Sequence, residues 1–526
     1  MTDHSVSLQQ TDPSTPAESA ITRVERAVLL TAVLIISICA LTYELIVATL
    51  TSYLLGNSIT QFSFTIGFFL FAMGLGALLS RRVKTNELRW FIIVEIAIGA
   101  FGGTSAIALF AVFATSQVYY YTTMLFFSLA IGICVGLEIP LLTRIIADRA
   151  DLGNALADIL SVDYIGALVA SLAFPILLLP ALGVTLTAFL MGLFNLLVAV
   201  ILLYRFGYRL NVVWKRNLWL TCALVAVGMI LGAVNSTQIL SYFEQRLYFH
   251  PIVYKDQTPY QNIVMTHNGL DTRLYIEGNL QFSSRDEYRY HEVLVHPVMS
   301  AARNHERVLV LGGGDGMVAR ELLKYDDVQE IIIVDLDPAI TDLARENRLV
   351  REINGDAMND PSVTVINTDA YTYIEQAGDL FPVVIIDLPD PNNESLSKLY
   401  SRQFYSLLHQ RLTPDGVFVT QSGSPYFVRE AFWMIANTVT DAGFNVLPMH
   451  TYIPSFGDWG FVLGGMHTTP QVSMPENIDD LRYLTPEVLI AAQAFDPDIA
   501  YLDTDINTLN NPVLPRVYEQ GWNQWN

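Results

Sequence analysis

Charged residues and cysteines are both scarce in this chain. Only 15% of its 526 residues are charged and 52% are hydrophobic, whereas a typical soluble domain carries about 25% charged residues. The hydrophobic content excludes an intrinsically disordered chain, and the shortage of charge indicates that part of the chain lies in lipid. The three cysteines, Cys39, Cys134 and Cys222, are too few for a disulfide scaffold or a cysteine-rich zinc site. Each stands in an apolar run, which favours a buried thiol, and no metal site is predicted.

Basic residues are scarce in the second half. Residues 1–243 hold 12 Lys and Arg against 12 Asp and Glu, whereas residues 244–526 hold 18 against 39 and carry the whole net charge of −21. A neutral, lipid-like half therefore precedes an acidic, water-soluble half. The acidic half argues against nucleic acid as a partner, because binding phosphates requires Lys and Arg. It is compatible with cationic small molecules, although most of this charge is expected to be solvated surface.

Long apolar runs fill residues 27–237, after a polar leader, residues 1–26, that we expect to be disordered. Each run reaches the ~20 residues that a membrane-spanning helix needs, so residues 27–237 are predicted to form a transmembrane domain of about seven helices. The first run is too long for a signal-peptide core and no small-residue cleavage site follows it, so we expect it to be retained. The runs lie at about 27–50, 61–80, 90–113, 118–142, 159–180, 183–205 and 217–235.

Lys and Arg are confined to alternate loops between these runs. The positive-inside rule places the basic loops and the leader on the cytoplasmic side, so the chain is predicted to be a multi-pass protein of the cell (inner) membrane. Seven crossings would put residues from about 240 onward outside the cytoplasm. The basic residues are Arg23 and Arg26, then Arg81, Arg82, Lys84 and Arg89, then Arg144 and Arg149, then Arg205, Arg209, Lys215 and Arg216.

Four carboxylates interrupt the apolar runs: Glu44, Glu95, Glu138 and Asp163. An acid inside a membrane is costly, so each is a functional candidate. Such a set could line a cation path or an amine-binding cavity, or its members could lie near helix ends or be paired inside the bundle. For Glu138, which precedes Pro140, we favour the structural interpretation.

The second half alternates between strand and helix patterns. Residues 238–300 are predicted to form a small antiparallel β-domain, with strands at 263–266 and 273–276. Residues 301–466 are predicted to form a Rossmann-like, methyltransferase-type doubly wound α/β domain, and residues 467–526 a C-terminal closing segment. Its strands are expected at 307–311, 330–334, 363–366, 383–386 and 416–420, with a helix opening at 317–324.

Three strand ends carry nucleoside-binding signals. A glycine loop, Gly312-Gly313-Gly314-Asp315-Gly316, follows the first strand; alone it is weak. Asp335 ends the second strand about 20 residues later, where a carboxylate can bind ribose hydroxyls. Asp369-Ala370 follows the third strand, where adenine would lie. The loop lacks the G-x-G-x-x-G spacing of pyrophosphate sites, so a methionine-derived nucleoside fits better than NAD.

Two acids follow the fourth strand, in Asp387-Leu388-Pro389-Asp390-Pro391. They are three residues apart on a proline-stiffened loop and are expected to face the same cleft. One such carboxylate can bind an ammonium group and the other can take its proton. Alone the pair could be a surface loop, but together with Asp315 and Asp335 it favours an amine substrate.

From about residue 245 onward the sequence resembles the polyamine aminopropyltransferases, the spermidine synthases. The motifs that carry the resemblance occur in family order and spacing. They are Tyr260-Gln261, the stretch 281–292 (QFSSRDEYRYHE), the glycine loop 312–316, 335–338 (DLDP), Asp369-Ala370, 387–391 (DLPDP) and 481–487 (LRYLTPE).

The resemblance implies decarboxylated S-adenosylmethionine as co-substrate, with no tightly bound cofactor. It implies that Gln261, Gly312, Gly314, Asp335, Asp369 and Ala370 hold the nucleoside, with Asp335 on the ribose, and that His291, Asp315 and Asp390 face the amine ends. Asp387 would be the general base and Tyr290 would help to orient the amine. Asp315 makes chemical sense here, because it would repel the carboxylate of a methyl donor but attract a bare aminopropyl ammonium.

The implied reaction moves an aminopropyl group to putrescine or a related diamine and releases spermidine and methylthioadenosine. The alternatives are a polyamine transporter or sensor whose soluble domain binds amines without turnover, and a methyltransferase, which Asp315 disfavours. The chain departs from the family in having Asp335 where Glu is usual and in Asn392-Asn393-Glu394 after the acid pair, so the identity of the acceptor stays open.

Expected partners are the diamine and membrane lipid, and a homodimer stays open. The co-substrate is made in the cytoplasm, so we expect the catalytic domain there, in conflict with the charge rule. The conflict would be resolved if the seventh run, 217–235, is re-entrant or interfacial, if the crossings are miscounted, or if the domain is outside.

Overall fold

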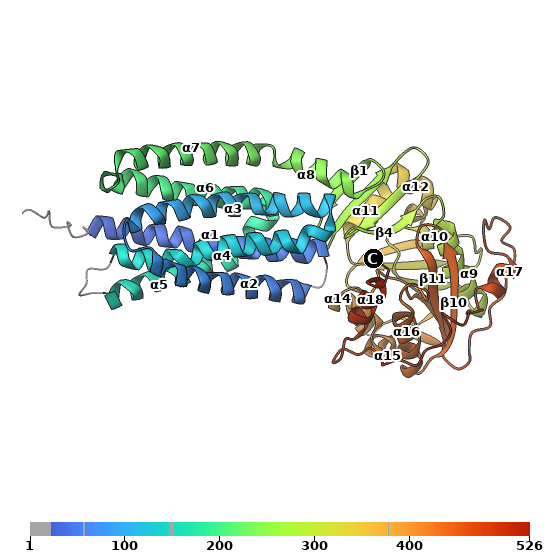
Figure 1. Cartoon of the computed structure of the whole chain (residues 1–526). Coiled ribbons are helices and arrows are strands. Elements are labelled where there is room, and N and C mark those ends of the chain that lie inside the picture. The colour runs from blue at the N-terminus through green and yellow to red at the C-terminus, as the bar shows by residue number, and fades with distance from the viewer. Residues whose placement is uncertain (1–22, 56–57, 147–151, 377, 526) are drawn as a thin grey trace, which may run out of the picture. The chain divides into compact units, whose positions relative to one another are not determined.

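The computed structural model describes residues 23–55, 58–146, 152–376 and 378–525. Most of the predicted leader, up to residue 22, and Arg149 lie outside these residues. The chain divides into two compact units, residues 1–247 and 248–526, and Figure 1 shows a helical first unit and a mixed second unit.

The first unit is a bundle of helices whose bounds follow the apolar runs. By length and hydropathy, six segments of the described chain could span a membrane. One of them, Gly153–Arg209, is 57 residues long and includes both α5 and α6. Within it Gly183 has φ of +68°, which glycine adopts readily, and this residue breaks the helical backbone. The helices are α1 (Arg23–Leu55), α2 (Ser58–Leu79), α3 (Glu87–Thr115), α4 (Tyr120–Ile146), α5 (Leu152–Ala173), α6 (Leu179–Phe206), α7 (Val212–Val234) and α8 (Ser236–Glu244).

Small residues let α2 and α4 approach closely. A Cβ added at Gly136 would overlap the backbone of Met73, and one at Gly76 would overlap the backbone of Ile133. Glycine at such positions is typical of helix pairs in membranes, where van der Waals packing replaces the hydrophobic effect between helices.

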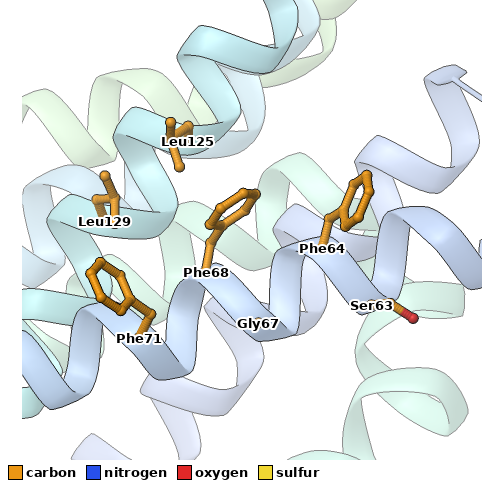
Figure 2. A pocket seen from close by; sticks show the side chains of 7 residues that line it. All are labelled: Ser63, Phe64, Gly67, Phe68, Phe71, Leu125 and Leu129. Carbon is orange, nitrogen blue, oxygen red and sulfur yellow. The ribbon is translucent and has the colours of Figure 1, made fainter.

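The same two helices form an apolar groove on the surface of the bundle. Figure 2 shows Phe64, Phe68 and Phe71 of α2 facing Leu125 and Leu129 of α4. All three phenylalanines are exposed. A row of exposed aromatic residues is unusual on a water-facing surface, so this face suits contact with lipid.

The second unit contains two sheets. The smaller sheet is antiparallel, in the order β1-β2-β3-β4, with β1 (Ile252–Gln257), β2 (Asn262–His267), β3 (Thr272–Ile276) and β4 (Asn279–Ser283). The larger sheet has the order β10-β11-β9-β8-β5-β6-β7. Its strands are β5 (Arg307–Gly312), β6 (Glu330–Asp335), β7 (Val363–Asn367), β8 (Phe381–Asp387), β9 (Leu412–Gln421), β10 (Asn445–Ile453) and β11 (Gly457–Gly465).

Strands β5 to β9 are parallel, and β10 and β11 extend the sheet antiparallel. In β5, Val308 and Val310 pack into one apolar cluster, whereas Leu309 and Leu311 pack into another. A strand buried on both faces is apolar at every position, which explains the continuous hydrophobic runs. The predicted fold, a Rossmann-like doubly wound sheet preceded by a small antiparallel sheet, is therefore confirmed.

Short helices complete the second unit. They are α9 (Glu287–Ala301), α10 (Met317–Leu322), α11 (Pro338–Glu346), α12 (Arg348–Asn354), α13 (Ala370–Glu375), α14 (Glu394–Ser397), α15 (Arg402–His409), α16 (Arg429–Asp441), α17 (Pro486–Ala491) and α18 (Leu514–Trp522).

Helix α9 is tied to the C-terminal segment through Glu292. This buried carboxylate accepts hydrogen bonds from the backbone N–H groups of Arg482, Tyr483 and Leu484, at 2.7, 2.9 and 2.8 Å. Hydrogen bonds to a charged acceptor are stronger than neutral ones, so this contact fixes the segment on the helix that carries Tyr290 and His291.

We therefore expect Glu292→Gln to destabilise the second unit by about 2–4 kcal/mol, because the amide keeps one acceptor and points a donor at backbone N–H groups. Thermal unfolding followed by circular dichroism checks this, with the exposed Glu346→Gln as the matched control. Equal midpoints for the two variants would show that the contact does not hold the segment.

Candidate active site

The parallel sheet brings the predicted strand-end residues to one edge. In the register of the sheet, Gly312 at the end of β5 pairs with Asp387 at the end of β8, and Leu311 pairs with Val334, next to Asp335. The carboxyl ends of neighbouring parallel strands are where such sheets bind ligands. The glycine loop therefore lies between the acids that end β6 and β8.

The glycine loop is bonded to both of these acids. Gly313 N–H donates to the Asp387 carbonyl at 3.1 Å, and Gly314 N–H donates to Asp335 Oδ2 at 3.1 Å. Gly312 has φ of +82°, and a Cβ there would overlap the Asp387 carbonyl. Glycine at 312 is thus required both by its backbone conformation and by the close approach of β8.

Asp335 is positioned to accept hydrogen bonds. Asp337 N–H donates to its second oxygen, Oδ1, at 3.1 Å. Burial raises the pKa of Asp335 to about 6, although its two backbone hydrogen bonds oppose this effect. The site therefore favours a ligand that donates hydrogen bonds to Asp335.

Gln261 is connected to the Asp335 loop through Thr258. The Thr258 hydroxyl donates to Asp337 Oδ2 at 2.6 Å, and Gln261 N–H donates to the same hydroxyl at 3.0 Å. The turn between β1 and β2 is thereby fixed beside the end of β6. These two hydrogen bonds link Gln261, the predicted site residue beside the small sheet, to the loop that follows Asp335, the predicted site residue of the large sheet.

Asp369 and Ala370 begin α13. Asp369 caps the helix by accepting from Thr372 N–H at 2.9 Å, and its other oxygen pairs with Lys398 Nζ at 2.8 Å. Partial burial alone would raise the pKa of Asp369, but Lys398 and Thr372 outweigh it and hold the pKa below its usual value. Both carboxylate oxygens of Asp369 thus have protein partners.

Tyr290 and Asp387 form a short hydrogen-bonded pair at the end of β8. The Tyr290 hydroxyl donates to Asp387 Oδ1 at 2.6 Å. Burial raises the pKa of Asp387 to about 6; Asp315 adds to this rise, while His291 and Tyr290 oppose it. Burial, together with the charges of Asp387 and Asp390, holds the pKa of Tyr290 well above its usual value. Near neutral pH Tyr290 is therefore a donor, and Asp387 is the group that can take a proton.

His291 belongs to a buried ionic chain. Its Nδ1 lies 2.9 Å from Glu287 Oε2, and Arg320 donates to both oxygens of Glu287, at 2.8 and 2.9 Å. Burial alone would lower the pKa of His291, but Glu287, Asp315 and Asp387 together raise it. A protonated His291 would then lie among acids.

Asp315 contributes a carboxylate that its own loop holds in place. Met317 N–H donates to its Oδ1 at 2.9 Å, and Asn354 donates to its backbone carbonyl at 2.9 Å. Burial raises the pKa of Asp315, His291 lowers it, and Glu287 raises it further. The structure thus brings Tyr290, His291, Asp315, Asp387 and Asp390 into one electrostatic group.

Asp390 has two partners that local sequence patterns did not identify. Gln421 Nε2 donates to its Oδ1 at 3.2 Å, and the Tyr518 hydroxyl donates to its Oδ2 at 2.6 Å. Burial raises the pKa of Asp390 to about 6, against these two hydrogen bonds. Gln421 ends β9 next to β8, so its strand-end position was an available signal. Tyr518 lies on α18, 128 residues away in sequence, and no local pattern indicates it.

The fold and these contacts fit one class of protein: a Rossmann-like transferase whose site is a set of buried acids suited to a cationic amine. A family model described as the spermine/spermidine synthase domain matches residues 287–475. A polyamine aminopropyltransferase of Leptospira interrogans is 42% identical over 94% of this chain and 98% of its own length. Polyamine aminopropyltransferase 1 of Streptomyces coelicolor is 39% identical over 98% of both chains.

A solved spermidine synthase in complex with the transition-state analogue AdoDATO covers 47% of this chain and 85% of its own, at 24% identity and a TM-score of 0.43. The two sequence relatives match nearly the whole chain, so the helical unit is part of what they share. The chain belongs to the polyamine aminopropyltransferase family and is an aminopropyltransferase that forms spermidine.

We expect Tyr518→Phe to raise the KM for the amine acceptor by about tenfold with a smaller change in kcat, because Asp390 loses a donor that orients it. Steady-state kinetics with saturating donor checks this, with the exposed Tyr452→Phe as the control. Unchanged kinetics would show that α18 takes no part in the amine site.

Proposed function

We propose that this chain transfers the aminopropyl group of decarboxylated S-adenosylmethionine to putrescine by direct displacement, with Asp387 as the base. The observation that carries the proposal is the 2.6 Å contact between Tyr290 and Asp387 at the end of β8, with Asp390 three residues further on. A sensor that only binds amines would not need a carboxylate that is held in place to take a proton from the amine.

The donor is proposed to lie along the ends of β5, β6 and β7. Asp335 accepts hydrogen bonds from the ribose hydroxyls, and Gln261, Gly312 and Gly314 shape the nucleoside subsite. Asp369 and Ala370 lie beside the adenine. Asp315 attracts the ammonium at the end of the aminopropyl chain, whereas it would repel the carboxylate that S-adenosylmethionine carries beside the same ammonium group.

Putrescine is proposed to bind among the remaining acids. Asp390 binds its distant ammonium, and Gln421 and Tyr518 fix the orientation of that carboxylate. His291 balances part of the negative charge between Asp315 and Asp387. Asp387 faces the reacting nitrogen and Asp390 the distant one, and both are carboxylates with a raised pKa, so both ends of the acceptor are recognised by charge.

The reaction then proceeds in one displacement. Asp387 takes a proton from the reacting ammonium of putrescine, and Tyr290 holds the carboxylate and amine in place. The free nitrogen attacks the aminopropyl carbon bonded to the sulfonium, a new C–N bond forms as the C–S bond breaks, and methylthioadenosine leaves. Positioning of the two substrates should supply most of the acceleration, with ~10²–10⁴-fold from the base.

The helical unit is proposed to hold the enzyme in the cell membrane, with lipid against surfaces such as the α2–α4 groove. The proposed organisation is a transmembrane bundle over residues 27–237, a small β-domain over 238–300, a catalytic domain over 301–466 and a closing segment over 467–526. Because the co-substrate is made in the cytoplasm, the catalytic unit is proposed to lie there.

Asp387→Asn should lower kcat by ~10²-fold or more with little change in donor binding, because the amide keeps the shape of the side chain but not its proton affinity. The comparison variant Asp390→Asn should instead raise the KM for putrescine more than it lowers kcat. Turnover of Asp387→Asn within threefold of the wild type would remove Asp387 from the role of base.

Asp315→Asn should narrow the preference for decarboxylated S-adenosylmethionine over S-adenosylmethionine, because the group that attracts the ammonium and repels the carboxylate is gone. Competition titration of the two nucleosides measures the ratio, with the exposed Asp415→Asn as the matched control. An unchanged ratio would show that Asp315 does not contact the end of the donor.

A further inference from the structure

A chain of polar side chains crosses the interior of the helical unit. Asn195 on α6 donates to Glu95 Oε2 on α3 at 2.9 Å, and the Tyr43 hydroxyl on α1 donates to Asn195 Oδ1 at 3.0 Å. Gly102 leaves the space that the ring of Tyr43 occupies. The side chains of Tyr43, Glu95 and Asn195 have no exposed surface.

Glu138 on α4 completes this cluster. The Glu95 and Glu138 carboxyl groups interact directly, and they can form a hydrogen bond to each other when one of them holds a proton. Glu138 is only 4% exposed. Among the described residues, Oε1 of Glu95 and Oε1 of Glu138 have no hydrogen-bond partner. Apart from a proton shared between the two carboxyls, no donor of the described chain satisfies these two buried oxygens.

No counterion for this pair is present within the described part of the bundle. The other titratable groups that face it are Cys39 and Tyr43 on α1, Cys134 on α4 and Asp163 on α5, and none of them is a cation. Two other acids of the unit do have an arginine: Glu25 lies 3.6 Å from Arg205, and Asp158 lies 2.6 Å from Arg26. In this respect the central pair differs from Glu25 and Asp158.

A buried carboxylate without a counter-charge is costly, so the pair must hold a proton or bind a cation. An alkylammonium group suits the two free Oε1 atoms, because it carries one positive charge and three N–H donors. The soluble unit meets the same ligand with a second pair of carboxylates, Asp387 and Asp390. One chain would then contain two acid pairs for one class of molecule.

We propose that Glu95 and Glu138 form a second amine site, in which the ammonium group of an aliphatic polyamine replaces the proton that the pair shares. The choice of a polyamine rests on the proposed function, since such amines are the substrates and products of this chain. Charge is conserved at the pair itself: one ammonium group enters as one proton leaves to water, the other ammonium group of the amine keeps its own charge, and no covalent bond changes. Glu44 lies on α1, outside the contacts that define the pair.

The test measures proton release when putrescine is added, without donor, to the full-length protein in detergent at pH 8 with a pH-indicator dye. At this pH Asp387 and Asp390, whose pKa values are about 6, are already ionised, and putrescine is fully protonated at its ammonium ends. We expect about one proton per chain from the wild type, from Asp387→Asn and from Glu44→Gln. Glu95→Gln and Glu138→Gln should release none.

Infrared difference spectra of the wild type give a second readout that needs no variant. Addition of putrescine should remove a protonated-carboxyl C=O band. The amine assignment would be overturned if the wild type released no proton, or if Glu95→Gln released as much as the wild type. It would equally be overturned if the carboxyl band did not change, or if NaCl alone caused the same proton release. Methylthioadenosine formation is measured separately, so turnover without proton release refutes only this inference, and release without turnover refutes only the proposed function.

Discussion

The hydrogen bond between Tyr290 and Asp387 joins the parts of the soluble unit on which the active site depends. Tyr290 comes from α9, and Asp387 ends a central strand of the large sheet. The Asp387 carbonyl also accepts from the glycine loop, so Asp387, the glycine loop and α9 are fixed to one another. Glu292, which directly follows His291 in α9, extends this connection to the C-terminal segment.

Charge explains why such a site suits amines. Asp315, Asp335, Asp387 and Asp390 are gathered at one edge of the sheet, and burial raises the pKa of each. Most of the positive charge inside is Arg320 with His291, and Glu287 neutralises part of it. Binding a cationic donor and a dicationic acceptor removes the mutual repulsion of these acids. The substrates thus supply the counter-charge that the protein lacks, and the same reasoning applies to Glu95 and Glu138 in the bundle.

The sequence could predict what depends on local pattern. Continuous apolar runs located β5 to β9, and polar residues at their ends located Asp335 and Asp387, because strand ends in a parallel sheet meet. Asp390 and the glycine loop were found by their spacing. The contact of Tyr518 with Asp390 and the pairing of Glu287 with Arg320 could not be predicted in this way. The two residues of each pair are far apart in the chain, and only packing brings them together. The contact between Glu95 and Glu138 depends likewise on how α3 packs on α4.

The most direct test of the account is the pH dependence of methylthioadenosine release by the purified protein with decarboxylated S-adenosylmethionine and putrescine. The base must be ionised, and the pKa of Asp387 in the free protein is about 6. The value of kcat/KM for putrescine should therefore fall as the pH drops below about 6 and level off above it. The corresponding fall in kcat should lie at lower pH, because the bound cationic amine favours the carboxylate. A flat kcat/KM from pH 5 to pH 8, or no methylthioadenosine at any pH, would contradict the account.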